Sequence, residues 1–263
     1  MNPIQEYLQK SEAILKTVEA QTTQIEKAAV WFADAILAGR VVHVFGSGHS
    51  RIMVEEMWPR YGSYPGFNPI VELSLTFHNL VVGANGQRQA MFLENVSGLA
   101  ERILRNFDVS DKDCALIISS SGTNIVPVEM AECFQQKKIK VVSIITKAHS
   151  EKSTSKRPDG KKLGDFSDLV LDTGAPVGDA MVKVEGLDTP VSPGSSLGGV
   201  LLINCIKAEL ARLLTRAGQP PKVLSAAAVV GAARAVELFE SAYDEHAHRL
   251  AKLYENVGKG GLG

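Results

Sequence analysis

Residues 41–50 read VVHVFGSGHS, in which an apolar run passes directly into a loop of small residues. The run has the β-branched and aromatic composition of a buried strand, and residues 52–57 resume with helix-forming side chains. Glycine lets the backbone approach a ligand closely, while the N–H groups of a helix start and the hydroxyls of Ser47 and Ser50 can face an anion. The stretch therefore predicts a strand-to-helix turn that binds an anion.

A second stretch repeats this plan at residues 114–124, CALIISSSGTN. Its loop has no basic side chain but four hydroxyl groups, those of Ser119, Ser120, Ser121 and Thr123. Neither stretch holds the lysine of a P-loop, and Arg51 stands where a dinucleotide motif needs its third glycine. Either loop alone could be an ordinary capped turn, but two on successive strand–helix units indicate a site for a phosphate monoester.

Strand-like and helix-like segments alternate along most of the chain. Strands are expected at residues 41–45, 69–73, 114–118, 140–145 and 168–172, and helices at residues 50–58, 95–106, 124–136, 197–217 and 225–254. Apolar strands that alternate with helices predict an α/β fold, a doubly wound parallel sheet flanked by helices. In such a sheet the ligand binds beyond the carboxyl ends of the strands, where both serine-rich loops would lie.

Three parts are expected in the chain. Apolar residues keep a helical spacing up to Gly39, which predicts a long N-terminal helix or a bent pair. The N-terminal helical extension would span residues 1–39, the ligand-binding domain residues 40–218, and a C-terminal helix and tail residues 219–263. Within the domain, residues 146–164 form a polar excursion with six basic residues, which could be a lid or a solvated face.

The two loops in this order resemble the SIS (sugar isomerase) domain, in which a strand, G-S-G-H-S and a helix precede a strand, S-x-S-G-x-N and a helix. The resemblance runs from about residue 40 to about residue 215. It is nearest to stand-alone bacterial SIS proteins similar to phosphoheptose isomerase, as Asn68-Pro69-Ile70, Ala148-His149-Ser150 and Asp244-Glu245-His246 suggest. The resemblance implies an SIS-type sandwich that binds a sugar phosphate. It also implies that Ser195 and Ser196, at the start of a later helix, border the sugar.

Isomerisation of an aldose to a ketose removes a proton next to a carbonyl and returns it to the neighbouring carbon, which one partly buried carboxylate can do. Glu55 and Glu56 follow the first loop, on the helix where related isomerases carry a Glu–Glu pair, although here the pair lies about one helical turn earlier. Successive helix positions diverge by about 100°, so at most one should reach the ligand. Glu94 is a third carboxylate, expected near the mouth of the sheet. The alternative for all three is an exposed helix surface.

Histidine can transfer protons between sugar oxygens near neutral pH. His49 in the first loop and His78 before a glycine-containing segment could line the pocket, whereas His43 in mid-strand is expected in the core. For His246, on the last helix, the resemblance implies that a C-terminal histidine can enter the site of a partner subunit. The candidate catalytic residues are therefore Glu55, Glu56, His78 and His246. The candidate binding residues are Ser47, Gly48, His49, Ser50, Ser119, Ser120, Ser121, Thr123, Asn124, Ser195 and Ser196.

No metal and no cofactor are expected. Asp244, His246 and His248 have i, i+2, i+4 spacing, which turns His246 away from the helix face that the other two share. The three cysteines lack C-x-x-C spacing and are expected to be reduced core residues. Metal binding therefore remains the weaker interpretation of these residues.

Composition and charge exclude several classes of protein. The chain has 263 residues, 45% hydrophobic and 22% charged, as is typical of a soluble globular protein. A net charge of −1 gives no electrostatic reason to expect nucleic acid or an anionic membrane as a partner. No segment reaches about 18 unbroken apolar residues, and the N-terminus lacks the form of a signal peptide, so the cytoplasm is the expected location.

Two classes of function agree with these features. The first is a sugar-phosphate enzyme, most simply an aldose–ketose isomerase, with elimination or deamination of an amino-sugar phosphate as a variant. The second is a non-catalytic SIS protein that senses a sugar phosphate. Regulators of that kind usually carry a helix-turn-helix domain, whereas residues 1–39 have one continuous apolar periodicity, which favours the enzyme. Apolar faces on the terminal helices predict a homodimer or homotetramer.

Overall fold

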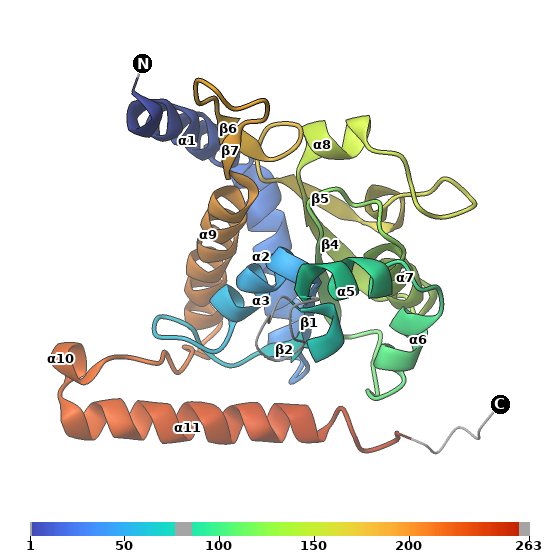
Figure 1. The fold of residues 1–263 in the computed structure, drawn as a ribbon. Coiled ribbons are helices and arrows are strands. Elements are labelled where there is room, and N and C mark those ends of the chain that lie inside the picture. The colour runs from blue at the N-terminus through green and yellow to red at the C-terminus, as the bar shows by residue number, and fades with distance from the viewer. Residues whose placement is uncertain (1, 77–85, 258–263) are drawn as a thin grey trace.

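Five parallel strands form the centre of the structure (Figure 1). The structure is a computed structural model and describes residues 2–76 and 86–257. The strands lie in the order β2-β1-β3-β4-β5. Their bounds are Val42–Gly46 (β1), Phe67–Ile70 (β2), Cys114–Ile118 (β3), Lys140–Ile145 (β4) and Leu169–Asp172 (β5). The predicted α/β fold with a doubly wound parallel sheet is thus confirmed.

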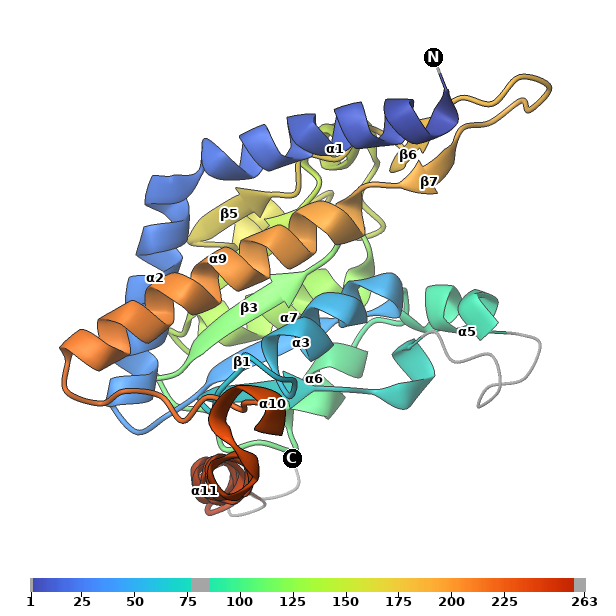
Figure 2. The same ribbon diagram turned by 90° about the vertical axis from the view of Figure 1, so that its left-hand side faces the viewer.

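Helices cover both faces of this sheet (Figure 2). One face packs against α2 (Thr22–Leu37), α3 (Arg51–Met57) and α9 (Ser195–Arg216), and the other against α6 (Leu99–Leu104) and α7 (Ile125–Gln136). Side chains alternate along a strand, so Val44 enters the first layer and Phe45 the second. Because both faces are buried, the strands are apolar at nearly every position.

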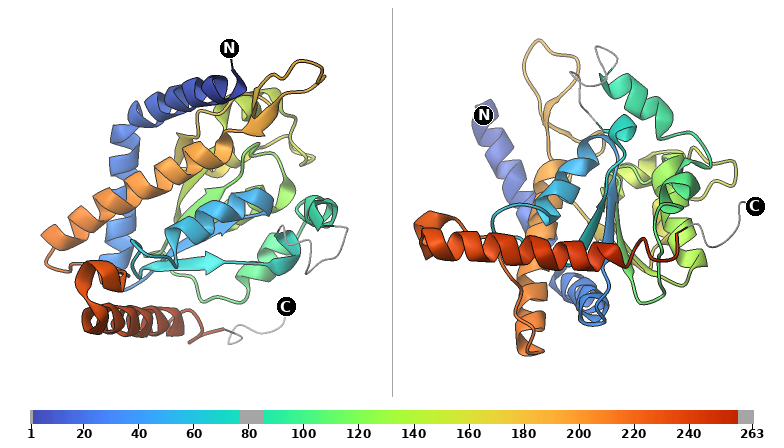
Figure 3. Two further views of the ribbon diagram at one scale, coloured as in Figure 1. Left: turned by 60° about the vertical axis from the view of Figure 1, so that its left-hand side comes forward. Right: turned by 90° about the horizontal axis from the view of Figure 1, so that it is seen from below.

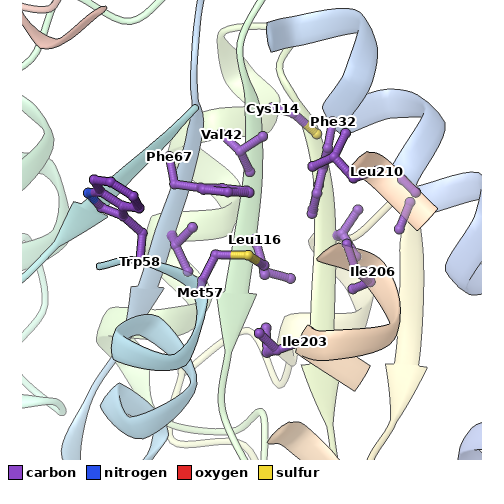
Figure 4. Packing of buried hydrophobic residues seen from close by; sticks show 14 of the residues in the cluster. Phe32, Val42, Met57, Trp58, Phe67, Cys114, Leu116, Ile203, Ile206 and Leu210 are labelled. Atoms are coloured by element: carbon purple, nitrogen blue, oxygen red, sulfur yellow. The ribbon is translucent and has the colours of Figure 1, made fainter. Parts of the chain in front are cut away.

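The first layer shows how closely the helices fit the sheet. Phe32 of α2 and Ile203 and Ile206 of α9 pack against Val42 and Leu116 (Figure 4). All five side chains are fully buried. Burial of each such side chain stabilises the fold by roughly 1.5–3 kcal/mol relative to exposure.

Helix α9 comes especially close to the sheet in its first turn. A Cβ atom built on Gly198 would lie 2.0 Å from the carbonyl oxygen of Thr173, and one on Gly199 would lie 2.9 Å from the Cγ of Met53. Glycine in a helix interior costs about 1 kcal/mol relative to alanine. At these two positions glycine allows α9 to pack closely on Thr173 and Met53, at the expense of helix stability. The result is that the start of α9, with Ser195, lies directly beside the end of β5.

The terminal helices differ in detail from the expectation. The bent pair is present as α1 (Pro3–Glu19) and α2, and Gln21 at the bend is hydrogen-bonded to both backbone groups of Asp172. The long helix expected at residues 225–254 is broken at Gly231, whose φ of +82° is not helical. It forms α10 (Ala227–Val230) and α11 (Ala232–Ala251), and α11 lies at the amino ends of the strands (Figures 1 and 3).

Several short elements were not expected from the sequence. They are α5 (Gly86–Leu93), α8 (Lys147–Lys152) and an antiparallel hairpin of β6 (Ala180–Val182) and β7 (Val191–Pro193). Each strand of the hairpin has three residues, too few for a period of two to be recognised, and tertiary contacts with α1 hold it in place. Within residues 2–76 and 86–257, none of the helices combines the length and apolarity that a membrane crossing requires.

His43 lies in the core, as expected for a residue in mid-strand. The side-chain amide of Asn68 donates to its Nδ1 (3.0 Å), so Nε2 carries the proton and donates to Asp113 (3.2 Å). Arg40 donates two further hydrogen bonds to the same carboxylate, at 2.8 and 2.9 Å. Burial alone would raise the pKa of Asp113, but the hydrogen bonds from His43 and Arg40 hold it at about 2. This buried carboxylate therefore joins β1, β2 and β3 at their amino ends.

Replacement of Asp113 is expected to destabilise the protein in a pH-dependent way. Asp113→Asn leaves the Arg40 charge without a partner, which should lower the free energy of unfolding by roughly 3 kcal/mol at pH 7. The native pKa of Asp113 lies below its ordinary value of 3.8, so its contribution is present above about pH 4 and is lost as the pH falls towards 2. Urea denaturation at pH 7 and pH 3 should show the difference from wild type shrinking at the lower pH. An equal loss for Asp111→Asn, an exposed neighbour, would contradict this role.

Candidate functional site

A cavity of about 610 Å³ opens at the carboxyl ends of the strands. Both serine-rich loops line it, together with α5, residues 149–156 and the first turn of α9. The structure places every predicted binding residue in its lining: Ser47, Gly48, His49, Ser50, Ser119, Ser120, Ser121, Thr123, Asn124, Ser195 and Ser196. Segments far apart in the sequence thus meet at the edge of the sheet where a ligand was expected. That these residues bind it stays a prediction.

The first loop follows β1 without a break. Ser47 accepts a backbone hydrogen bond from the N–H of Ser50 (3.0 Å), which closes a short 3₁₀ turn over Gly48–Ser50 before α3 begins. The hydroxyl of Ser47 does not cap this turn and donates instead to the carboxylate of Glu94 (2.7 Å). The loop is therefore formed by its backbone and leaves its first serine side chain to the cavity.

Hydrogen bonds within the second loop fix its shape. The Oγ of Ser119 accepts from the N–H of Gly122 (3.2 Å), and the Oγ of Ser121 accepts from both the N–H and the hydroxyl of Thr123 (3.3 and 2.9 Å). Because the oxygen of Ser121 accepts two bonds, its own proton remains to be donated. Asn124 is the N-cap residue of α7, yet its side chain makes no cap hydrogen bond. Asn124 itself lines the cavity at the start of this helix.

Glu94 connects the two loops. Its Oε2 accepts from Ser47 (2.7 Å) and its Oε1 from the side-chain amide of Asn124 (2.8 Å), while its backbone carbonyl accepts from the N–H of Val126 (2.9 Å). Burial raises the pKa of Glu94 above its ordinary value, although the bonds from Ser47 and Asn124 and the charge of Lys156 oppose this effect. The carboxylate that the sequence ranked third thus lies in the cavity.

Glu55 and Glu56 lie elsewhere, beside a separate groove between α3 and α11. The Glu55 side chain is 56% exposed and pairs with Arg51. Glu56 accepts a hydrogen bond from Asn204 (2.7 Å), and the ammonium of the buried Lys207 lies 3.9 Å from its carboxylate. Burial alone would raise the pKa of Glu56, but bonds from Asn204 and Arg60 and the charge of Lys207 lower it. In the described chain, the surroundings of Glu56 are those of a structural ion pair.

Of the two remaining catalytic candidates, only His246 belongs to the described residues, and it does not line the cavity. His246 packs against Trp58, with ring centroids 5.2 Å apart, and burial lowers its pKa. Its proposed entry into the site of a partner subunit stays a prediction. His78 falls outside the described residues. Among residues 2–76 and 86–257, no group of three His, Cys, Asp or Glu side chains is arranged to hold a metal ion.

Three ionisable residues of the cavity were not among the candidate site residues from the sequence: His149, Lys156 and Asp179. Asp179 accepts hydrogen bonds from the N–H of Gly194 (3.0 Å) and from the N–H and hydroxyl of Ser195 (2.6 and 2.8 Å), so it caps α9 from a distant loop. His149 and Lys156 belong to the basic excursion at residues 146–164. Its composition predicted a lid or a solvated face, and no spacing distinguished these two residues from the others.

Comparison with known proteins agrees with this geometry. A family model described as the SIS domain matches residues 6–146. A UPF0309 protein of Halalkalibacterium halodurans is 35% identical over 81% of this chain and 86% of its own length, and one of Thermoanaerobacter pseudethanolicus is 30% identical over 86% and 92%. The structure of a phosphoheptose isomerase from Francisella tularensis is similar with a TM-score of 0.51, covering 80% of this chain and 96% of that one at 14% identity. At that identity the likeness concerns the fold.

The hydrogen bond from Ser47 is expected to control the acidity of Glu94. Ser47→Ala removes a donor to the ionised carboxylate, so the pKa of Glu94 should rise further above its ordinary value. A ¹³C NMR titration of labelled glutamate carboxyls would measure this shift. Ser120→Ala is the matched control, because Ser120 lines the same cavity but bonds to Thr146. An unchanged or lowered pKa in Ser47→Ala would show that the bond does not stabilise the charged form.

The structural role of Glu56 can be separated from that of its neighbour. Glu56→Gln should lower the free energy of unfolding by roughly 2 kcal/mol, because Lys207 would keep a buried charge without its partner. Glu55→Gln should change it by less than about 0.5 kcal/mol, since an exposed ion pair contributes little. Chemical denaturation of both variants at pH 7 checks the ranking. Equal effects would mean that the Lys207 pair is not a structural element.

Proposed function

Since this chain belongs to the SIS domain family, we propose that it is a sugar-phosphate isomerase that interconverts an aldose and a ketose. The place of Glu94 carries this proposal, because a partly buried carboxylate lies between the two serine-rich loops. The likeness of the fold to a phosphoheptose isomerase supports it. The ligand-binding domain would comprise residues 40–218, with residues 1–39 and 219–263 as added helices and tail.

The second loop is the better candidate for the phosphate. In the first loop Ser47 already donates to Glu94, whereas in the second loop Ser121 keeps a proton to donate. The positive end of the α7 dipole lies beside Asn124 and would further favour an anion at this loop. With the phosphate at this loop, the carbonyl end of an open-chain sugar would extend towards Glu94 and the start of α9.

Glu94 has the chemistry that an isomerase base requires. Its carboxylate would remove the proton next to the carbonyl, and the same group would return that proton to the neighbouring carbon of the enediol. Burial raises its pKa, which makes the ionised form a stronger base than an exposed glutamate. His49 and His149 also line the cavity and could transfer the proton between the two sugar oxygens.

A homodimer or homotetramer is part of the same proposal. Exposed apolar side chains on both terminal helices support it, since such groups are usually covered in an assembly. They include Ile4, Leu8 and Leu15 on α1 and Val236 and Phe239 on α11. In such an assembly the His246 of one subunit could approach the cavity of another.

Incorporation of deuterium tests the proposal directly. The protein in D₂O, incubated with a panel of sugar and amino-sugar phosphates, should introduce deuterium at C1 or C2 of at least one member, as observed by NMR. Glu94→Gln should reduce this exchange by at least roughly a hundredfold, because general-base catalysis typically contributes that much. Glu101→Gln, an exposed glutamate on α6, is the control and should exchange like wild type.

Other outcomes would point elsewhere. Exchange that survives in Glu94→Gln but vanishes in Glu55→Gln or Glu56→Gln would place the base on α3. Binding of a sugar phosphate without exchange for any member of the panel would replace the isomerase by a non-catalytic sensor. Release of the C2 or C3 substituent would indicate the lyase or deaminase variant.

A further inference from the structure

The two serine-rich loops offer hydroxyl and amide groups but no cation. A phosphate monoester carries up to two negative charges, and a charge-assisted bond from a cation is stronger than a bond from a neutral donor. Of the described residues that line the cavity, Lys156 is the one lysine or arginine. It comes from residues 153–163, of which Ser153 and Thr154 also line the cavity.

Backbone hydrogen bonds attach this segment to the second loop at two points. The N–H of Lys156 donates to the carbonyl of Thr123 (3.0 Å), and the N–H of Leu163 donates to that of Gly122 (2.8 Å). Between them, Arg157 pairs with Glu132 of α7 (2.6 Å). The stretch predicted as a lid or a solvated face is therefore a wall of the cavity, and the position of Lys156 is set by the loop it adjoins.

The charge of Lys156 shares the cavity with the carboxylate of Glu94. It acts on the carboxylate of Glu94, where it opposes the effect of burial on the pKa of that group. The carboxylate in turn is held by Ser47 and Asn124 and cannot follow the ammonium elsewhere. The lysine side chain, exposed and with four rotatable bonds, is the mobile member of this pair.

We propose that Lys156 is the phosphate-binding cation of this site and that it exchanges its interaction with Glu94 for one with the phosphate when the ligand enters. The inference rests on the proposed function and adds to it a means by which the site distinguishes a sugar phosphate from a sugar without phosphate. With Lys156 on the phosphate, Glu94 loses the charge that favoured its ionised form and gains an anion nearby, so it becomes a stronger base. A sugar without phosphate leaves the pair intact and Glu94 less basic.

Titration with inorganic phosphate tests the assignment without any need for turnover. Binding is followed by ³¹P NMR line broadening at constant ionic strength and pH 7. Lys156→Met should weaken phosphate binding at least about tenfold, since charge-assisted bonds to phosphate are the strong ones. Lys156→Arg should stay within about threefold of wild type, because it keeps the charge. Lys152→Met is the control, as Lys152 is exposed on α8 and does not line the cavity.

A second variant tests the exchange itself. Glu94→Gln frees Lys156 from its present partner, so it should bind inorganic phosphate about threefold or more tightly than wild type. The gain should disappear in the double variant Glu94→Gln/Lys156→Met. A gain that persists in the double variant would show that Glu94 repels phosphate without Lys156.

The two proposals can fail separately. Phosphate binding that is equal in Lys156→Met, Lys152→Met and wild type would overturn the role of Lys156 and leave the isomerase proposal standing. Normal phosphate binding without deuterium exchange would overturn the isomerase and leave Lys156 assigned. No phosphate binding by wild type would overturn both the phosphate site and the role of Lys156.

Discussion

The parallel pairing of β1 with β3 fixes the relative position of the two serine-rich loops that line the cavity. Gly46 lies opposite Ile118, so both strands end at the same height and release their loops side by side. A register shift of one residue would turn the buried side chains of β1 to the other face, which the two apolar layers prevent. At the amino ends of the same strands, hydrogen bonds to the buried carboxylate of Asp113 also hold β1 and β3 together. The serine-rich loops thus obtain their relative position from the core.

Two carboxylates in this structure show how surroundings decide what a glutamate can do. Glu56 is matched by Asn204, Arg60 and Lys207, and its ionised form is stabilised. Glu94 has neutral donors and one lysine charge against the effect of burial, and its ionised form is disfavoured. A carboxylate of the second kind suits proton transfer, whereas one of the first kind suits a permanent ion pair.

The sequence was sufficient for the parts of the fold that depend on local chemistry. Both loops could be predicted because two turns rich in glycine and serine follow apolar strands on successive strand–helix units. The sheet followed from the alternation of apolar strands with helices. Glu94 could not be ranked first, because its place depends on a long connection after β2 and on a hydrogen bond to Asn124. Lys156 depends in the same way on pairing with Thr123, which leaves no pattern within its own segment. Both residues are thus placed by contacts between segments far apart in the sequence, and such contacts leave no pattern within either segment.

The close approach of α9 at Gly198 has a consequence for how this cavity could diversify. At Gly198 the backbone of α9 packs so closely on Thr173 that a side chain at this position would force the helix away from the sheet. Helix α5 and residues 153–163 on the other side belong to connections, which accept insertions and substitutions more readily. New ligand preferences, whether they arise by natural drift or by engineering, would therefore come from changes in α5 and residues 153–163, while the start of α9 keeps its place.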